Sequence, residues 1–201
     1  RHLLNELDGQ DVYVDTDSSM IFKDLKDSKI TCYKRKQKFI DLENDGDFRV
    51  SPVLLMIENF LDEYVIDENE IIVTPHVTSP FIKLSTMIQA SKKLNDGYDS
   101  IHACTKHKEF TYFKGQPVNF NPDVVQKTQD LEPVIMGNGA FFIFTKKTFK
   151  ENNNRTGNNP CFFPIGFPED IEIDYEEDWN LTERIYAVSY THLRAHETDS
   201  Y

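Results

Sequence analysis

The sequence Ile71-Ile72-Val73-Thr74-Pro75-His76-Val77-Thr78-Ser79-Pro80-Phe81-Ile82-Lys83 is typical of a buried strand that ends in a loop. An apolar run stops at Pro75, small hydroxyl residues follow, and a second proline precedes a helix-like segment. In open α/β sheets, ligands bind outside the carboxyl ends of the strands, so we expect this loop to form the floor of a ligand site. Backbone N–H groups and the hydroxyls of Thr78 and Ser79 suit an anion or a ribose, and His76 adds an imidazole. A turn with Ser79 as a helix N-cap accounts for the same residues, and the two interpretations are compatible.

The rest of the chain alternates between strand-like and helix-like segments, which predicts a parallel sheet with helices on both faces. Residues 106–129 depart from this rhythm. They contain a hairpin signal around Lys114-Gly115, and we expect them to leave the sheet and to serve oligomerisation. The expected strands are 11–17, 30–33, 71–75, 99–105, 139–145, 161–165 and 171–174; the expected helices are 20–25, 53–64, 84–94 and 175–187, with Trp179 as the anchor of the last; loops are expected at 43–47 and 152–160.

Composition excludes several classes of protein. The chain has 201 residues and a formal net charge of -12, which argues against nucleic acid or an anionic membrane as the main partner. No apolar run approaches the length of a membrane span, and no signal peptide opens the sequence. Its three cysteines are Cys32, Cys104 and Cys161, which are far apart and lack metal spacing, so we expect reduced thiols in a cytoplasmic protein.

Both ends of the sequence look unusual. Residues Leu3, Leu4 and Leu7 read as the end of an amphipathic helix already under way, closed by Asp8-Gly9, so we expect an earlier strand and loop to be missing. We expect a single domain over 1–187 and a non-native tail over 188–201. The tail resembles a translated sequencing adapter, and its two histidines therefore receive no weight as metal ligands.

Two clusters of charge are candidates for chemistry. In the expected strand 171–174, Glu172 and Asp174 would point to the same face, and paired carboxylates suit Mg²⁺. On composition alone, an acidic surface explains them better. The cations of 34–38, which include Arg35, follow a strand and would suit a phosphate or carboxylate, although a solvated loop is the simpler interpretation.

A third candidate is the uncharged segment Asn138-Gly139-Ala140. Its glycine permits a backbone conformation closed to other residues, and its asparagine could bind a polar substituent of a ligand.

Taken in order, these segments resemble the sugar cytidylyltransferases that activate acylneuraminate-type sugars as CMP conjugates. The resemblance runs from about Leu3 to Ala187, and each motif is loose while their order and spacing are specific. The residues that carry it are Val14-Asp15-Thr16-Asp17, Arg35, His76-Val77-Thr78-Ser79-Pro80-Phe81, Gln129-Asp130-Leu131-Glu132-Pro133, Asn138-Gly139-Ala140-Phe141-Phe142-Ile143 and Ile171-Glu172-Ile173-Asp174-Tyr175-Glu176-Glu177-Asp178-Trp179.

The resemblance implies a three-layer, Rossmann-like nucleotidyltransferase fold with a mostly parallel sheet and a small dimerisation excursion. It implies CTP and a sugar acid as substrates, Mg²⁺ as cofactor, and a homodimer. By position in the motifs, the catalytic and metal-binding residues would be Glu172 and Asp174. The nucleotide-binding residues would be Arg35, Thr78, Ser79 and Asp17, and the substrate-binding residues would be His76, Gln129, Asn138 and Gly139.

The sequence also departs from the family's pattern. The family has a glycine- and lysine-rich loop that holds the CTP triphosphate, and in this sequence that loop would lie before Arg1. We therefore expect residues 1–201 to be inactive by themselves. An arginine that often precedes Asn-Gly-Ala is replaced by Met136-Gly137, which argues against N-acetylneuraminate itself. The alternatives are a nucleotidyltransferase for 3-deoxy-octulosonate or a sugar phosphate, and a sugar- or nucleotide-binding remnant without turnover.

Overall fold

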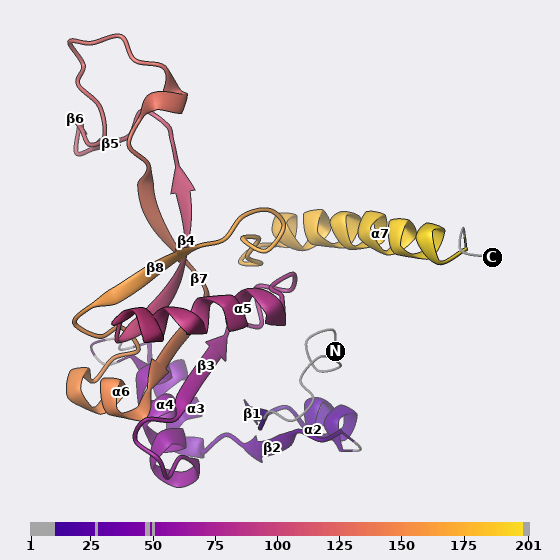
Figure 1. Cartoon of the computed structure of the whole chain (residues 1–201). Helices are drawn as coiled ribbons and strands as arrows, with labels where there is room; N and C mark the ends of the chain where they lie inside the picture. Colours follow the sequence, from indigo (N-terminus) through magenta and orange to yellow (C-terminus); the bar gives the residue numbers. More distant parts are fainter. Residues whose placement is uncertain (1–10, 27, 47–48, 50, 199–201) are drawn as a thin grey trace. The chain divides into compact units, whose positions relative to one another are not determined.

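A computed structural model describes residues 11–26, 28–46, 49 and 51–198 of the chain (Figure 1). The chain divides into two compact units, which are described separately below. Unit 1 comprises Arg1–Ile72 and Phe144–Asn158, and unit 2 comprises Val73–Ile143 and Asn159–Tyr201. The helix end predicted at Leu3–Gly9 lies outside the described residues. No helix among the described residues is both long enough and apolar enough to cross a membrane.

Unit 1 contains a two-stranded parallel sheet. Strand β1 (Tyr13–Thr16) pairs with β2 (Thr31–Lys34), with Tyr13 opposite Thr31. Helix α2 (Ser19–Leu25) connects them, and the Ser18 side chain caps it by accepting a bond from the Ile21 amide. The other helices of the unit are α3 (Gln37–Asp45), α4 (Pro52–Tyr64) and α6 (Lys146–Asn152).

Helices α3 and α6 correct the predictions for this unit. The sequence predicted charged loops at 34–38 and 43–47, but α3 occupies residues 37–45 and ends at Gly46, whose φ of 67° is typical of a helix C-terminus. Buried Phe39 supplies its apolar contact. Helix α6 begins after Thr145, whose side chain accepts a bond from the Thr148 amide, and it was not predicted. Both helices are short, which leaves little room for a helical period to show.

Unit 2 is built on a four-stranded sheet with the order β3 (Ile71–Pro75), β7 (Val134–Thr145), β4 (Ser100–His107) and β8 (Pro160–Pro164). Strands β4 and β8 are parallel. Between β3 and β7, the His76 amide donates to the Ala140 carbonyl and the Thr74 hydroxyl to the Phe142 carbonyl. The partner number falls along β7 as it rises along β3, which is an antiparallel pattern.

Strand β7 therefore runs opposite to the other three strands of this sheet, since the chain also returns along β7 from the end of β4 (Figure 1). The predicted α/β class with a mostly parallel sheet is confirmed. The core of the unit lies mainly on the two central strands, where the fully buried side chains include Ile101, Cys104, Phe141 and Ile143. All three cysteines are free thiols, as predicted.

Helix α5 (Leu84–Ser91) and the 3₁₀ turn η1 (Lys92–Asp96) follow the loop after β3. The predicted role of Ser79 as an N-cap is wrong, because α5 begins only after Lys83. Instead the Ser79 amide donates to the His76 carbonyl, and the Ile82 amide donates to the Ser79 carbonyl. Consecutive turns therefore connect β3 to α5, which begins at Leu84, where the helix 84–94 was expected.

Helix α7 (Glu176–Thr198) closes the described chain. It covers residues 176–187 of the predicted helix 175–187 and continues into the residues that were predicted to be a foreign tail. Trp179 is 55% exposed, so the prediction that it anchors this helix is wrong. Thr182, three residues further on, is the buried residue of this stretch. The pattern of apolar residues in the sequence did not predict that this position would be buried.

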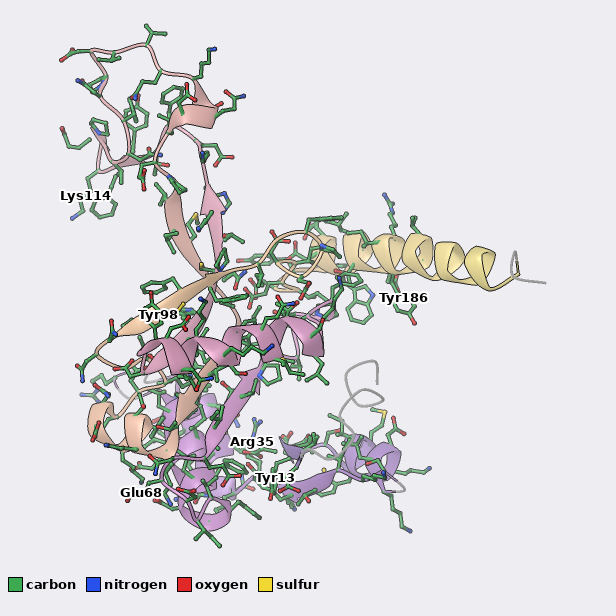
Figure 2. All side chains as sticks on the ribbon, in the orientation of Figure 1. Tyr13, Arg35, Glu68, Tyr98, Lys114 and Tyr186 are labelled. Carbon is green, nitrogen blue, oxygen red and sulfur yellow. The ribbon has the colours of Figure 1, made fainter. Side chains whose placement is uncertain are left out.

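The chain leaves the sheet between the end of β4 and the start of β7, at the place where an excursion was predicted (Figure 1). Here β5 (Tyr112–Phe113) pairs antiparallel with β6 (Gln116–Pro117), which confirms the hairpin. Lys114, labelled in Figure 2, and Gly115 form the turn with φ values of 50° and 78°. Two consecutive positive φ angles are the geometry of a two-residue hairpin loop. The 3₁₀ turn η2 (Thr128–Asp130) lies further along the excursion.

Candidate functional site

In unit 2, two backbone hydrogen bonds hold the loop after β3 in place. The His76 amide donates to the carbonyl of Ala140 on β7, with N and O 2.9 Å apart. The Ile173 amide donates to the carbonyl of Thr78, also at 2.9 Å. These bonds tie three segments that are distant in sequence: the loop, the Asn-Gly turn of β7 and the acidic segment before α7. The sequence had singled out each of these segments separately.

The acidic segment 171–174 is not the strand that was predicted, since none is assigned to these residues. Alternation of isoleucine and acid resembles a half-buried strand, but the segment bonds to a loop rather than to a sheet edge. Glu172 nevertheless reaches the loop, because the Thr78 hydroxyl donates to its Oε1 across 3.4 Å. The prediction of a strand at 171–174 was wrong, but Glu172 contacts the loop through Thr78.

Electrostatics at Glu172 favour a cationic ligand. Burial raises the pKa of the Glu172 carboxyl above its ordinary value, and the negative charge of Asp174 raises the same pKa further. The hydrogen bond from Thr78 lowers this pKa and so opposes the first two effects in part. A partly buried carboxylate with a second one beside it is relieved by a bound cation.

Asp174 is held by the start of α7. The amides of Asp174 and Tyr175 both donate to the same carboxylate oxygen of Asp178, at 3.1 and 3.0 Å. This is one half of a capping box, in which an acid in the first helical turn bonds back to the residues before the helix. These bonds fix the backbone at Asp174, whose negative charge acts on the Glu172 carboxyl. Asp178 was not predicted as a functional residue, although its place in the first turn of an expected helix was a usable signal.

Gly139 brings the histidine and the acid together. Its φ is 72°, a conformation that side-chain-bearing residues rarely adopt. A Cβ placed there would lie 3.6 Å from His76 Nδ1 and 3.8 Å from Glu172 Oε1. We call His76, Thr78, Gly139, Glu172 and Asp174 the loop cluster. Five of the ten predicted site residues therefore meet in unit 2.

Two polar atoms next to the loop cluster are buried and have no hydrogen-bond partner among the described residues: the Ser79 hydroxyl and the Asn138 amide nitrogen. Ser79 is only 3% exposed. The other end of the Asn138 amide accepts a bond from the Ala140 amide at 3.2 Å, which fixes the direction of its nitrogen. Buried polar groups are nearly always bonded, so these two atoms are suited to a ligand's acceptor or donor groups.

The structure explains why position 137 holds a glycine and not a larger residue. A Cβ on Gly137 would lie 2.9 Å from Cε1 of His102, closer than real Cβ contacts. The ring of His102 packs on Phe142, with centroids 4.2 Å apart. A histidine of β4 thus occupies the space beside β7 that a larger residue at position 137 would need.

The loop cluster meets the chemical requirements for Mg²⁺ in one respect. Magnesium is commonly bound by one or two carboxylates together with several waters and substrate phosphates, and Glu172 with Asp174 supplies such a pair. The described residues contain no group of three or more histidines, cysteines or acids arranged to hold a metal. The pair therefore fits magnesium held jointly with a substrate, and does not fit an all-protein zinc site.

The remaining nucleotide candidates lie in unit 1. Arg35 follows β2 (Figure 2), and its guanidinium is bound by acids on two elements: Nε donates to Oδ1 of Asp15 at 3.3 Å, and Nη1 donates to Oε2 of Glu43 at 2.8 Å. Asp17 is exposed just beyond the end of β1. The two acids that hold Arg35 were missed, because neither lies near it in sequence.

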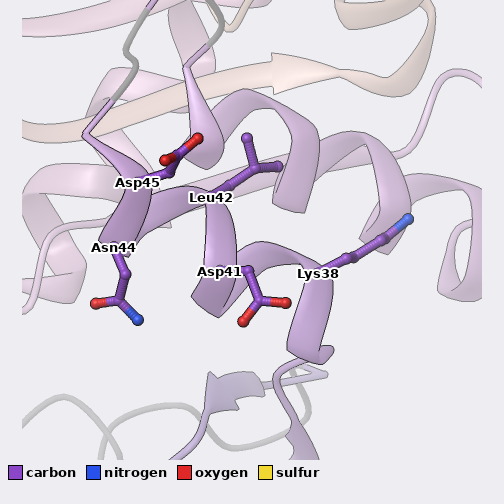
Figure 3. A pocket seen from close by; sticks show the side chains of 5 residues that line it. All are labelled: Lys38, Asp41, Leu42, Asn44 and Asp45. Atoms are coloured by element: carbon purple, nitrogen blue, oxygen red, sulfur yellow. The ribbon is translucent and has the colours of Figure 1, made fainter.

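Gln129 lies in η2 of the excursion, with an exposed side chain and a backbone carbonyl that accepts a bond from Lys108 Nζ at 2.7 Å. None of the described contacts links Gln129 to the loop cluster within one chain. Two surface depressions are lined by none of the loop-cluster residues. One lies along α3 and is lined by Lys38, Asp41, Leu42, Asn44 and Asp45 (Figure 3). The other lies in the excursion and is lined by Phe110, Tyr112, Phe120, Pro122, Val124, Val125 and Gln126.

Comparison with known proteins shows similarity both in sequence and in structure. No protein-family model matches the chain. Over 126 residues it is 25% identical to N-acylneuraminate cytidylyltransferase A from Danio rerio; the match covers 58% of this chain and only 29% of that protein. The fold is similar to a crystal structure of 4-diphosphocytidyl-2C-methyl-D-erythritol synthase, with a TM-score of 0.54 and 8% identity over 90% of this chain and 84% of that one. This second likeness concerns the fold alone, and it confirms the Rossmann-like α/β architecture.

Proposed function

We propose that the protein is a cytidylyltransferase that transfers CMP from CTP to a nonulosonic, sialic-acid-like sugar. The observation that carries the proposal is the loop cluster, in which the hydroxyl of Thr78 bonds to Glu172 and Gly139 admits both Glu172 and His76. The order of the motifs and the similarity to a curated cytidylyltransferase support the same reaction.

The reaction is an in-line displacement at phosphorus. The anomeric hydroxyl oxygen of the sugar acid forms a new bond to the α-phosphorus of CTP. The bond from that phosphorus to the bridging oxygen breaks, and pyrophosphate leaves with the bonding electrons while the hydroxyl proton passes to a base. The protein's main tasks are positioning and neutralising charge, since phosphoryl-type transfer involves little covalent chemistry of the enzyme itself.

Each candidate residue then has a role. Glu172 and Asp174 would hold Mg²⁺, which when bound neutralises charge on the phosphates and orients the sugar. His76, Asn138, Gly139 and Gln129 would contact the sugar. Arg35, Asp17, Thr78 and Ser79 would contact the nucleotide. The buried Ser79 hydroxyl and Asn138 nitrogen support these roles, because each has hydrogen-bonding capacity that a ligand would satisfy.

The excursion supports a homodimer. Tyr112, Val124 and Val125 line the depression there and are exposed, and the next residue along β5, Phe113, is exposed as well. Contiguous exposed apolar patches mark interaction sites, and a second copy is the commonest partner of a soluble protein. In such a dimer, Gln129 would complete the sugar site of the partner subunit rather than that of its own chain.

The test is pyrophosphate release from CTP with Mg²⁺ present, using protein expressed from its complete gene and a panel of acceptor sugars. We expect release with a nonulosonic acid that exceeds release with 3-deoxy-octulosonate or a hexose 1-phosphate. UTP in place of CTP is the matched control and should give little product. No turnover of CTP with any nonulosonic acid would refute the proposal.

A further inference from the structure

The guanidinium of Arg35 is held at two edges by carboxylates of unequal burial. On the β1 side, Nε bonds to the Asp15 carboxylate at 3.3 Å and Nη2 to the Asp15 carbonyl at 3.5 Å. On the α3 side, Nη1 bonds to the Glu43 carboxylate at 2.8 Å. The Asp15 side chain is 19% exposed and that of Glu43 is 38% exposed.

These two partners have different consequences for a ligand. Asp15 sits on a strand and bonds through both its side chain and its backbone, so it fixes the direction of the arginine. Glu43 reaches Nη1 from one exposed side chain, so solvent or another anion can replace it at small cost. Arginine offers its donors as a rigid fork that matches carboxylates and phosphates equally well.

We propose that Glu43 is a built-in competitor for the anion site on Arg35, and that it sets the affinity of this site for phosphate oxygens. In the ligand-free protein, the Glu43 carboxylate occupies Nη1. A phosphate displaces it and takes over the same charge-assisted hydrogen bond while Asp15 keeps the guanidinium oriented. The identity of the anion as CTP rests on the proposed function, whereas the exchange itself rests on the geometry of unit 1.

The two acids should therefore have opposite effects when they are neutralised. Glu43→Gln removes the competing charge and should strengthen anion binding. Asp15→Asn removes the orienting charge and should weaken it. The matched control is Glu58→Gln, which removes an equal charge from α4 of the same unit, where Glu58 bonds to Lys150 at 3.2 Å rather than to Arg35.

The experiment is the rate at which phenylglyoxal modifies Arg35, followed by peptide mass spectrometry, with and without inorganic pyrophosphate or CTP. We expect about fivefold faster modification in Glu43→Gln, and half-protection at about fivefold lower ligand concentration, because a charged hydrogen bond is replaced by a neutral one. Glu58→Gln should match the wild type, and Asp15→Asn should need more ligand. Glu43→Ala provides a second variant and should shift both quantities in the same direction as Glu43→Gln.

The failures of the two proposals are distinguishable. Unchanged modification and protection in both Glu43 variants, or weaker protection in them, would overturn the inference. Faster modification with protection by pyrophosphate, combined with no CMP transfer in the turnover assay, would support Glu43 as the competitor and refute the proposed reaction.

Discussion

At Glu172, the carboxyl has a raised pKa because it is partly buried beside Asp174. Between the ordinary and the raised pKa, the folded chain binds more protons than the unfolded chain. The contribution of this group to stability is therefore greatest at acidic pH, where the carboxyl is protonated, and it is lost as pH rises through the raised pKa. The residue opposes folding at neutral pH, as expected of a group kept for function.

Replacing Glu172 by glutamine should therefore raise the melting temperature at pH 7 to 8. The difference from wild type should shrink on acidification and vanish below the ordinary pKa of 4.5. Thermal unfolding followed by circular dichroism over this pH range measures it. The exposed Glu70→Gln is the control and should show no such trend. A melting temperature at pH 7.5 below that of wild type would contradict the interpretation of Glu172.

Gly139 gives a second prediction at the level of one residue. Gly139→Ala places a Cβ at ordinary contact distance from His76 and Glu172, so the expected cost is backbone strain at φ 72° rather than collision. That strain is about 1 kcal/mol. Urea unfolding should show this loss for Gly139→Ala and almost none for Gly166→Ala, whose Cβ would meet no atom within 4 Å. Equal effects at the two glycines would contradict the conformational role.

Among the elements, the start of α7 determines where Asp174 lies. Asp178→Ala removes the acceptor of two amide hydrogen bonds and should destabilise the protein by about 1 kcal/mol. It should also weaken Mg²⁺ binding measured by calorimetry, because Asp174 loses its support. The exposed neighbour Glu177→Ala is the control, with little effect on either quantity. Loss of stability with unchanged Mg²⁺ affinity would contradict the claim that the start of α7 positions Asp174 for the metal.

The elements also show what could be predicted from sequence. Strands β1, β2 and β3 and the β5–β6 hairpin were predictable, because apolar runs bounded by turn residues mark them locally. Helix α3 was not, since its acids and lysines read as loop composition. All five residues of the loop cluster were predicted as site residues from the sequence. The prediction that Glu172 and Asp174 point to the same face relied on a strand at 171–174, and that strand does not form. Asp15 and Glu43 escaped prediction because contacts across 20 and 8 residues leave no local signal.

For the whole molecule, the exposed apolar surface of the excursion predicts self-association. Val125 is fully exposed in the single chain, as is Ile66 in unit 1. Val125→Lys should convert a dimer to a monomer in sedimentation velocity, because a charge would be buried at the interface. Ile66→Lys should leave the dimer intact. A monomeric wild-type protein at micromolar concentration would contradict the proposed dimer.

The central claim is that Glu172 and Asp174 form the metal site of a CMP transfer. The direct measurement is the rate of formation of the CMP-sugar, identified by mass spectrometry, for wild type, Asp174→Asn and Asp170→Asn under the same Mg²⁺ concentration. We expect wild-type and Asp170→Asn proteins to form the product at similar rates, and Asp174→Asn to be slower by about a hundredfold or more, which corresponds to about 3 kcal/mol. Formation of the product at the wild-type rate by Asp174→Asn would contradict the claim.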